Sequence, residues 1–452
     1  MNFKQFYLGC LAHASYYIGS ETEAAIIDPQ RDVEQYLAEA EANNQKIKYI
    51  IETHSHADFV SGHIELASKT GAKIIYGSKA NTAFEAHKVK DGDELNVGKV
   101  KLKFLETPGH TPEGITILAQ TAGETDKLFT GDTLFIGDVG RPDLIGSKGF
   151  SAEEMAGFLY DSLREKILPL PDETEVYPAH GAGSMCGKNL SKETWSTLGL
   201  QRQFNYALQP MSKEEFVKIV AADQTEAPAY FPKSAAKNLE GAMALEDLPK
   251  PKEFSTEKIS NFDGVVLDVR QNYEYGAGHI PNSINIGLGG QFASWAGCLI
   301  PIETPLVLAA ETKAQVDEAF MRLARVGHES VKGFILMKDW DLDVKTIEQV
   351  SVEEVSELTQ TEKYLQFVDV RREGEFADGH APRTVNLTLS GLSNLTEKLD
   401  KSAPVYVICQ GGYRSSAGTS IFERAGFSRI YNVTGGTSAW LKAGLETEKS
   451  SE

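Results

Sequence analysis

The chain has 452 residues and a formal net charge of −19 at pH 7. It is too long for a single hydrophobic core, and a length of this order predicts about three domains. The acidic balance, with no basic stripe in any segment, excludes nucleic acid as a partner. Because there is no run of about 18 apolar residues and no secretory cleavage pattern, we predict a cytoplasmic protein without a membrane span.

From residue 3 to about residue 208, short β-rich runs alternate with helical patterns. Several runs end directly on a polar residue, as "AAIID" does on Asp28, and the others end on His54, His110 and Asp132. Loops at strand ends are where binding sites commonly lie. We therefore expect a site at one edge of the first domain.

A helical stretch and the Pro/Lys/Glu-rich run "LEDLPKPKEFSTEK" follow, and we predict a linker there. An internal repeat comes next, since "VVLDVRQNYEYGAGHIPNSINI" matches "QFVDVRREGEFADGHAPRTVNL" with the same Asp-to-His interval. Two copies of one α/β module of about 100 residues are expected. The predicted boundaries are 1–210 for the first domain, 211–254 for a helical segment and linker, and 255–350 and 351–452 for the two modules.

The first domain contains an ordered set of motifs, "THSHAD", "TPGHT", "TGDTLF" and "PAHG". A lone histidine is most often a core or surface residue, whereas this set places imidazoles and carboxylates at neighbouring strand ends. Such side chains can converge on one metal ion. The candidate ligands are His54, His56, Asp58, His110, Asp132 and His180.

These motifs resemble the metallo-β-lactamase superfamily, whose αββα sandwich the resemblance implies for residues 1 to about 210. Phe59 stands where two-metal members of the superfamily carry a further histidine ligand, and a phenyl ring cannot bind metal. One metal is therefore expected. With His54, His110 and Asp132 as ligands, the two imidazoles and one carboxylate leave open positions that suit Fe(II) oxygen chemistry.

The domain resembles the persulfide dioxygenase branch of that superfamily. The resemblance implies one Fe(II) per chain, a thiol persulfide of the glutathione, coenzyme A or bacillithiol type, O₂ as co-substrate, sulfite as product, and a homo-oligomer. Arg141, in "GDVGRPDL", is expected at the pocket rim, where a guanidinium can bind a substrate carboxylate bidentately.

Other polar residues fit supporting roles in the first domain. Asp28 and Asp58 are candidates for orienting imidazole N–H groups. Spacing leaves open whether His56 is a ligand or a neighbour, and His180 is a weaker ligand candidate. Cys186, in "PAHGAGSMCGK", is either a pocket thiol or a small buried one.

The second repeat contains a thiol loop, "VYVICQGGYRSSAG", which runs from a β-branched strand through Cys409 to a helix. Loop amides, the helix N-terminus and Arg414 all stabilise a thiolate or its persulfide. Cys-based phosphatases place five residues between Cys and Arg, and the four here resemble the rhodanese family of sulfurtransferases. We predict Cys409 and Arg414 as catalytic, and the sulfur cradle as Gln410, Gly411, Gly412, Tyr413 and Ser415.

The first repeat has Ala310 at the position of Cys409 and Gln315 at that of Arg414. Without a nucleophile it cannot carry a persulfide, and we expect a structural or docking role. The four cysteines, which form no CxxC pair, are predicted to be free thiols.

Together the two resemblances predict a persulfide dioxygenase–sulfurtransferase that serves sulfide detoxification. Sulfite from the first domain would accept sulfur from Cys409 to give thiosulfate, and the reverse flow with thiosulfate as donor uses the same residues. One alternative is a glyoxalase II-like thioester hydrolase fused to sulfur-carrier modules. Another is a sulfur-sensing binding protein. Phe59 argues against the first alternative, and the intact Cys409 loop argues against the second.

Overall fold

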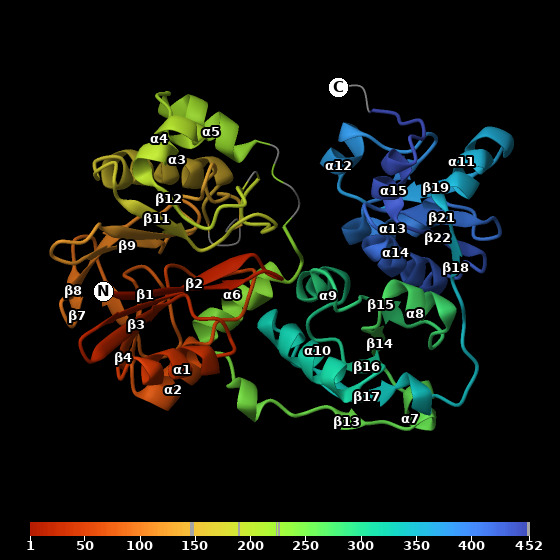
Figure 1. Cartoon of the computed structure of the whole chain (residues 1–452), viewed down its shortest axis with the longest axis horizontal. Helices are drawn as coiled ribbons and strands as arrows, with labels where there is room; N and C mark the ends of the chain where they lie inside the picture. Colours follow the sequence, from red (N-terminus) through yellow and green to blue (C-terminus); the bar gives the residue numbers. More distant parts are fainter. Residues whose placement is uncertain (145–148, 189, 223, 225–226, 450–452) are drawn as a thin grey trace. The chain divides into compact units, whose positions relative to one another are not determined.

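The computed structural model describes residues 1–144, 149–188, 190–222, 224 and 227–449. Its contacts divide the chain into two compact units. The first comprises Met1–Leu248 with Ala324–Gly327, and the second Pro249–Leu323 with His328–Glu452 (Figure 1). Within the described ranges, no helix combines the length and the apolar character that a membrane crossing requires.

The first unit contains two six-stranded sheets, with the strand orders β1-β2-β3-β4-β5-β6 and β12-β11-β10-β9-β8-β7. The strands of the first sheet are β1 (Asn2–Leu8), β2 (His13–Ser20), β3 (Glu23–Ile27), β4 (Lys46–Ile51), β5 (Lys73–Gly77) and β6 (His87–Val89). Those of the second are β7 (Glu94–Val97), β8 (Val100–Glu106), β9 (Ile115–Gln120), β10 (Lys127–Gly131), β11 (Glu175–Pro178) and β12 (Ser196–Thr197).

Alternating side chains give each sheet two buried faces. On β2, Tyr16 and Ile18 join the core between the sheets, whereas Tyr17 joins a separate cluster beneath α1 and α2. Three further helices cover the outer face of the second sheet. This arrangement is the predicted αββα sandwich. The covering helices are α1 (Glu34–Ala42), α2 (His63–Thr70), α3 (Ala152–Ser162), α4 (Leu198–Phe204) and α5 (Lys213–Ala221).

The segment predicted as a helical stretch and linker is mostly part of the first unit. Phe216 and Val220 of α5 lie in the core that covers the second sheet, and α6 (Phe231–Glu240) buries Ser234 and Asn238. The predicted boundary at residue 210 therefore differs from the structural one, near Leu248. Besides Phe231, the buried residues of α6 are the polar Ser234 and Asn238, and their hydrogen-bond partners lie in segments far away in the sequence.

The second unit contains two five-stranded sheets of parallel neighbouring strands, with the matching orders β13-β17-β16-β14-β15 and β18-β22-β21-β19-β20. The first comprises β13 (Lys252–Glu253), β14 (Val265–Asp268), β15 (Ile284–Asn285), β16 (Leu306–Ala310) and β17 (Val331–Leu336). The second comprises β18 (Glu348–Val350), β19 (Gln366–Asp369), β20 (Val385–Asn386), β21 (Val405–Ile408) and β22 (Ile430–Val433).

The first strand of each sheet, β13 or β18, begins a few residues before the module start predicted at residue 255 or 351. Both strands are very short, which is why the sequence did not place them. The helices of the first module are α7 (Thr256–Ser260), α8 (Asn272–Ala277), α9 (Phe292–Leu299) and α10 (Lys313–Arg325). Those of the second are α11 (Val352–Thr361), α12 (Glu373–Asp378), α13 (Leu392–Leu395), α14 (Tyr413–Arg424) and α15 (Gly436–Lys442). The common strand order agrees with the internal repeat seen in the sequence.

Helix α14, which follows the thiol loop, is covered by the first module along a seam of polar contacts. Ser416 Oγ donates to Asn285 Oδ1 at 2.6 Å. Further along the helix, Glu423 pairs with His279 Nε2 at 2.9 Å and accepts the Asn282 N–H at 2.7 Å. The module without a nucleophile therefore holds the active module's helix in place.

His328 gives the second unit a predicted acid sensitivity. Its side chain is fully buried, and burial lowers its pKa to about 4. The unfolded chain binds the proton at an ordinary pKa near 6.5, so this contribution to stability is complete above pH 6.5 and is lost as pH falls toward 4. We expect the difference in unfolding free energy between wild type and His328→Gln to change by about 3 kcal/mol over that range. Denaturant unfolding at several pH values measures it, and parallel curves for the two proteins contradict the assignment.

Candidate metal centre and thiol loop

Three predicted ligands meet at one edge of the first unit. His54 follows β4, His110 follows β8, and Asp132 directly follows β10. All three are buried, and their ligand atoms lie within 4.8 Å of one another. Asp132 Oδ2 is 3.4 Å from His110 Nε2 and 3.8 Å from His54 Nε2, and it has no hydrogen-bond partner among the described residues. A buried carboxylate oxygen facing two imidazoles in this way fits a divalent metal ion.

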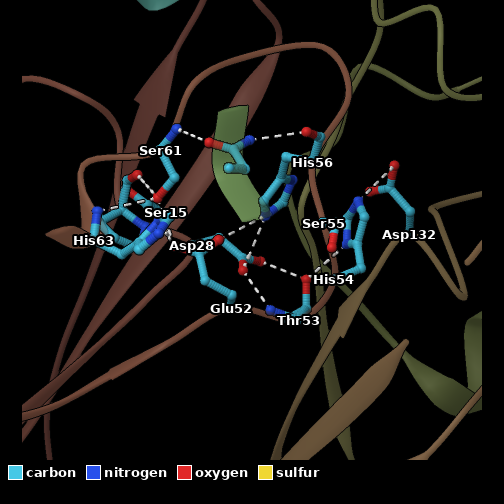
Figure 2. Close-up of polar contacts among 12 residues, drawn as sticks. Ser15, Asp28, Glu52, Thr53, His54, Ser55, His56, Ser61, His63 and Asp132 are labelled. Carbon is cyan, nitrogen blue, oxygen red and sulfur yellow. Dashed lines mark hydrogen bonds and ion pairs between the residues drawn. The ribbon is translucent and has the colours of Figure 1, made fainter. Parts of the chain in front are cut away.

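Hydrogen bonds set the direction in which both imidazoles present a lone pair. His54 Nδ1 lies 2.9 Å from Thr53 Oγ1, whose hydroxyl donates to Asp28 at 2.8 Å (Figure 2). His110 Nδ1 donates to the Arg141 carbonyl at 2.8 Å. Because both Nδ1 atoms carry the proton, both Nε2 atoms are free to bind metal. Thr53, which precedes the first ligand, supplies this orientation and was not predicted.

The charges of the group match what a metal requires. Burial lowers the pKa of both His54 and His110, so the imidazoles are neutral near pH 7. Burial alone would raise the pKa of Asp132, but the neighbouring His180, His54 and His110 hold it well below its usual range. The two imidazoles are therefore neutral and the carboxylate is ionised, which is the protonation state that metal binding requires.

His180 lies between two carboxylates. Its Nδ1 is 2.8 Å from Asp132 Oδ1, and its Nε2 is 2.8 Å from Asp58 Oδ2. Burial lowers the pKa of His180, but Asp132 and Asp58 together raise it well above the usual value. The ligand atoms of Asp58, His180 and Cys186 form a second group within 4.8 Å. Burial, followed by Asp58 and Asp132, raises the pKa of Cys186, so the thiol stays protonated.

His56 is grouped with two other carboxylates and not with His54. Its Nε2 is 3.1 Å from Asp28 and 3.5 Å from Glu52. Burial opposes protonation, but Asp28 and Glu52 raise the pKa of His56 to about 9. Figure 2 shows this pairing on the side of the loop away from Asp132. The arrangement assigns His56 a supporting place beside the ligands.

Phe59 is fully enclosed among these histidines. Its ring centroid is 4.1 Å from that of His13 and 4.6 Å from that of His56. The phenyl ring is 1% exposed, so it fills the place next to the site with apolar surface. His13, which sequence patterns did not single out, is also fully buried, and its ring nitrogens have no hydrogen-bond partner in the described part of the chain.

A cavity of about 480 Å³ opens beside His110. Its wall is largely apolar, and α6 contributes one side of it with Phe231, Ala235 and Leu239. The other described lining residues are Ser55, Ala57, Asn81, Thr82, Ala83, Thr111, Glu113, Leu144, Ala227, Pro232, Ala236 and Glu240. A small thiol compound fits a space of this size and character.

Arg141 does not lie where the sequence suggested. Its guanidinium is 2% exposed and forms a bidentate pair with Asp143, at 2.7 Å on both sides, and it also donates to the Met185 carbonyl. It is absent from the described lining of the cavity. The expected partner was a substrate carboxylate, but Asp143, two residues along the chain, provides that carboxylate. The Arg141 main chain contributes instead, through its bond to His110.

The thiol loop has the predicted form in the second module. Cys409 directly follows β21, and its sulfur accepts the Gly412 N–H at 3.1 Å and lies 3.4 Å from Ser415 Oγ. Gly412 adopts φ +96°, a left-handed conformation that favours glycine and turns its amide toward the sulfur. Arg414 is held by a bidentate pair with Glu375 of α12, at 2.6 and 2.7 Å. All four cysteines of the chain are free thiols.

Two side chains of the predicted cradle point elsewhere. Tyr413 donates from its hydroxyl to the Gly287 carbonyl of the first module at 2.8 Å, because its ring lies against the 287–290 segment. Gln410 donates to Ser438 at 2.8 Å. These residues, with Gly411, contribute backbone to the loop, and their side chains attach it to neighbouring elements.

In the first module, the loop that corresponds to the thiol loop is filled by the side chain of Gln315. Gln315 Oε1 accepts the N–H groups of Glu311 and Thr312, at 2.8 and 3.2 Å. Those amides occupy the place of the sulfur cradle, directly after Ala310. A module that lacks a nucleophile and closes its own amide cradle fits the predicted structural role.

Comparison with known proteins agrees with this architecture. The profile of the metallo-beta-lactamase superfamily matches residues 8–180, and that of the rhodanese-like domain matches 232–337 and 351–443. Human mitochondrial persulfide dioxygenase ETHE1 is 32% identical over 216 residues, which are 46% of this chain and 75% of that protein. Hydroxyacylglutathione hydrolase of Polaromonas sp. strain JS666 is 38% identical over 161 residues, 35% of this chain and 57% of the hydrolase. The chain thus spans less than two thirds of that hydrolase.

A crystal structure described as a metallo-beta-lactamase from Staphylococcus aureus subsp. aureus COL is 34% identical, with a TM-score of 0.67 over 74% of this chain and 98% of its own. The fold and the ligand group define a two-sheet unit with a candidate metal centre, followed by two repeated α/β modules, the second of which carries a thiol loop. The chain belongs to the metallo-β-lactamase superfamily, has relatives among persulfide dioxygenases and hydroxyacylglutathione hydrolases, and carries two rhodanese-like domains. The predicted fold class and fusion are confirmed.

Proposed function

We propose that the first unit oxidises the persulfide of a low-molecular-weight thiol with O₂, yielding sulfite and the free thiol. One observation carries this proposal: Asp132 Oδ2, which has no hydrogen-bond partner among the described residues, faces His54 and His110, and His110 lines the 480 Å³ cavity. These residues would hold one Fe(II), and bound iron supplies the binding and reduction of O₂.

The chain's own residues prepare the site for that chemistry. Thr53 and the Arg141 carbonyl fix the two imidazoles, and the apolar wall of the cavity keeps water away from the reacting sulfur. The outer sulfur leaves the persulfide as sulfite, whose three oxygens come from O₂ and one water, while the inner sulfur keeps a proton as the thiol. The carrier thiol is of the glutathione, coenzyme A or bacillithiol type.

The second active part is the Cys409 loop, which transfers sulfane sulfur. The Cys409 sulfur takes the outer sulfur of a second persulfide, releases its thiol, and passes that sulfur to sulfite to form thiosulfate. The Gly412 amide, Ser415 and the nearby Arg414 support the negative charge on the bound sulfur. Together the two reactions convert the outer sulfurs of two persulfides into thiosulfate, as a step of sulfide detoxification, and thiosulfate can feed the same cysteine in the opposite direction.

A second candidate function is hydrolysis of glutathione thioesters. The hydrolase relatives favour it, and so does the group Asp58, His180 and Cys186, which offers ligands for a second metal beside the first. Two features favour the dioxygenase instead. Phe59 replaces one imidazole with a buried ring, and both nitrogens of His180 already bind carboxylates.

Product analysis with glutathione persulfide separates the two functions. The iron-loaded chain should consume one O₂ for each sulfite plus thiol released, when sulfur transfer is blocked by a Cys409→Ser substitution. Cleavage of S-lactoylglutathione, without O₂ uptake on the persulfide, would overturn the dioxygenase proposal in favour of the hydrolase.

A further inference from the structure

Helix α6 has two faces with different partners in the first unit. Tyr230 at its N-cap, Ser234 and Asn238 follow each other at intervals of four residues and are all buried. Phe231, Ala235 and Leu239, shifted by one residue, line the cavity beside His110. Helix α6 therefore contacts both the cavity beside His110 and the buried interior of the first unit.

The buried face of α6 meets the loop of residues 52–62, which we call the ligand loop because it carries His54. Asn238 Nδ2 donates to the carbonyls of His56 and Phe59, both at 2.8 Å. Its Oδ1 accepts the Ser61 N–H at 2.8 Å. Both donors and the acceptor of this amide are therefore used on one loop, and the side chain is fully buried.

The ligand loop depends on such contacts because residues 52–62 lie outside strands and helices. Some of its buried backbone groups bond to other main-chain atoms, as the Val60 N–H does to the Arg325 carbonyl. The carbonyls of His56 and Phe59 and the Ser61 N–H are bonded instead by the Asn238 side chain. Tyr230 adds one further bond, from its hydroxyl to the Asp58 carbonyl at 3.2 Å. The loop that holds the first metal ligand is thus anchored by a helix about 180 residues further along the chain.

We propose that Asn238 is a positioning residue of the metal centre, which acts through the backbone of the ligand loop to hold His54 in place for metal binding. The proposal rests on the metal role given above to His54, His110 and Asp132, but it does not depend on which reaction the metal supports. It makes α6 a part of the active site, where the sequence suggested a spacer.

The test compares Asn238→Ala with Asn205→Ala in the full chain. Asn205 is an apt control because it is also fully buried and donates to two carbonyls, of Phe135 and Asp138, while accepting the Ala207 N–H. Both variants lose the same kind of bonds in the same unit. The readouts are Co(II) affinity by chelator competition, the visible spectrum of bound Co(II), circular dichroism and thermal unfolding as a report on the folding of the first unit, and Cys409 sulfurtransferase activity as a report on the second unit.

We expect Asn238→Ala to bind Co(II) on the order of 10–100-fold more weakly, with an altered spectrum, as is typical when a group that orients a ligand is lost. Asn205→Ala should keep the wild-type spectrum and affinity, and both variants should keep sulfurtransferase activity. Equal Co(II) affinities and spectra for the two variants would overturn the proposal.

A second variant covers the case in which Asn238→Ala does not fold. Asn238→Ser keeps one hydroxyl donor, and we expect it to show an intermediate loss of affinity. Wild-type Co(II) affinity in that variant would also refute the positioning role. No persulfide is used in the Co(II) measurement. A chain that binds Co(II) as expected but hydrolyses thioesters would therefore contradict the proposed function without contradicting the positioning role of Asn238.

Discussion

Asp132→Asn will reduce persulfide-dependent O₂ uptake by at least about 10³-fold, which corresponds to about 4 kcal/mol. The substitution preserves the shape of the side chain but removes the negative charge that faces His54 and His110. Without an anionic ligand, a divalent metal loses both its charge partner and its third protein contact. We therefore expect bound metal to be lost together with the activity, as measured by elemental analysis and an oxygen electrode.

Asp138→Asn is the matched control for that experiment. Asp138 is a buried carboxylate six residues further on, and it accepts hydrogen bonds from Tyr206 and the Lys188 N–H without joining a ligand group. The Asp138→Asn protein should keep its bound metal and its O₂ uptake. Both variants should keep the sulfurtransferase activity of Cys409, which lies in the other unit. An Asp132→Asn protein with wild-type metal content and O₂ uptake would refute the ligand assignment.

Cys409→Ser will change the product and leave the first reaction intact. A hydroxyl in place of the thiol cannot carry a sulfane sulfur, so sulfurtransferase activity should fall by at least about 10³-fold. O₂ uptake with the persulfide should persist, and sulfite should accumulate where the wild type yields thiosulfate. Ion chromatography of the products checks this prediction.

The control for the second prediction is Cys298→Ser. Cys298 is a partly buried thiol of α9 in the module without a nucleophile, and burial raises its pKa to about 12. This variant should form thiosulfate like the wild type. Thiosulfate formed at an undiminished rate by Cys409→Ser would show that the loop is not the site of sulfur transfer.

The sequence predicted the parts of the site that lie directly at strand ends. His54, His110 and Asp132 follow β4, β8 and β10, so their convergence follows from the two-sheet architecture once those strands are recognised. The thiol loop was predictable for the same reason, because its spacing is local. The interval between Cys409 and Arg414 is a property of one turn, and it does not depend on distant segments.

The remaining features depend on contacts that no local pattern contains. Arg141 pairs with Asp143, and a loop sequence does not show whether a guanidinium meets its neighbour or a substrate. Tyr413 is turned away from the sulfur by the carbonyl of Gly287, which lies in the other module. Asn238 bonds a loop about 180 residues earlier, and the sequence of its helix does not show which distant segment the buried polar side chains meet.

The most direct test of the central claim combines metal analysis with a choice of substrates on one preparation of the whole chain. Metal is counted per chain, and O₂ uptake with glutathione persulfide is compared with hydrolysis of S-lactoylglutathione. We predict one iron per chain, O₂ consumed with the persulfide, and no cleavage of the thioester. Two zinc ions per chain, with thioester cleavage and no O₂ uptake, would contradict the account.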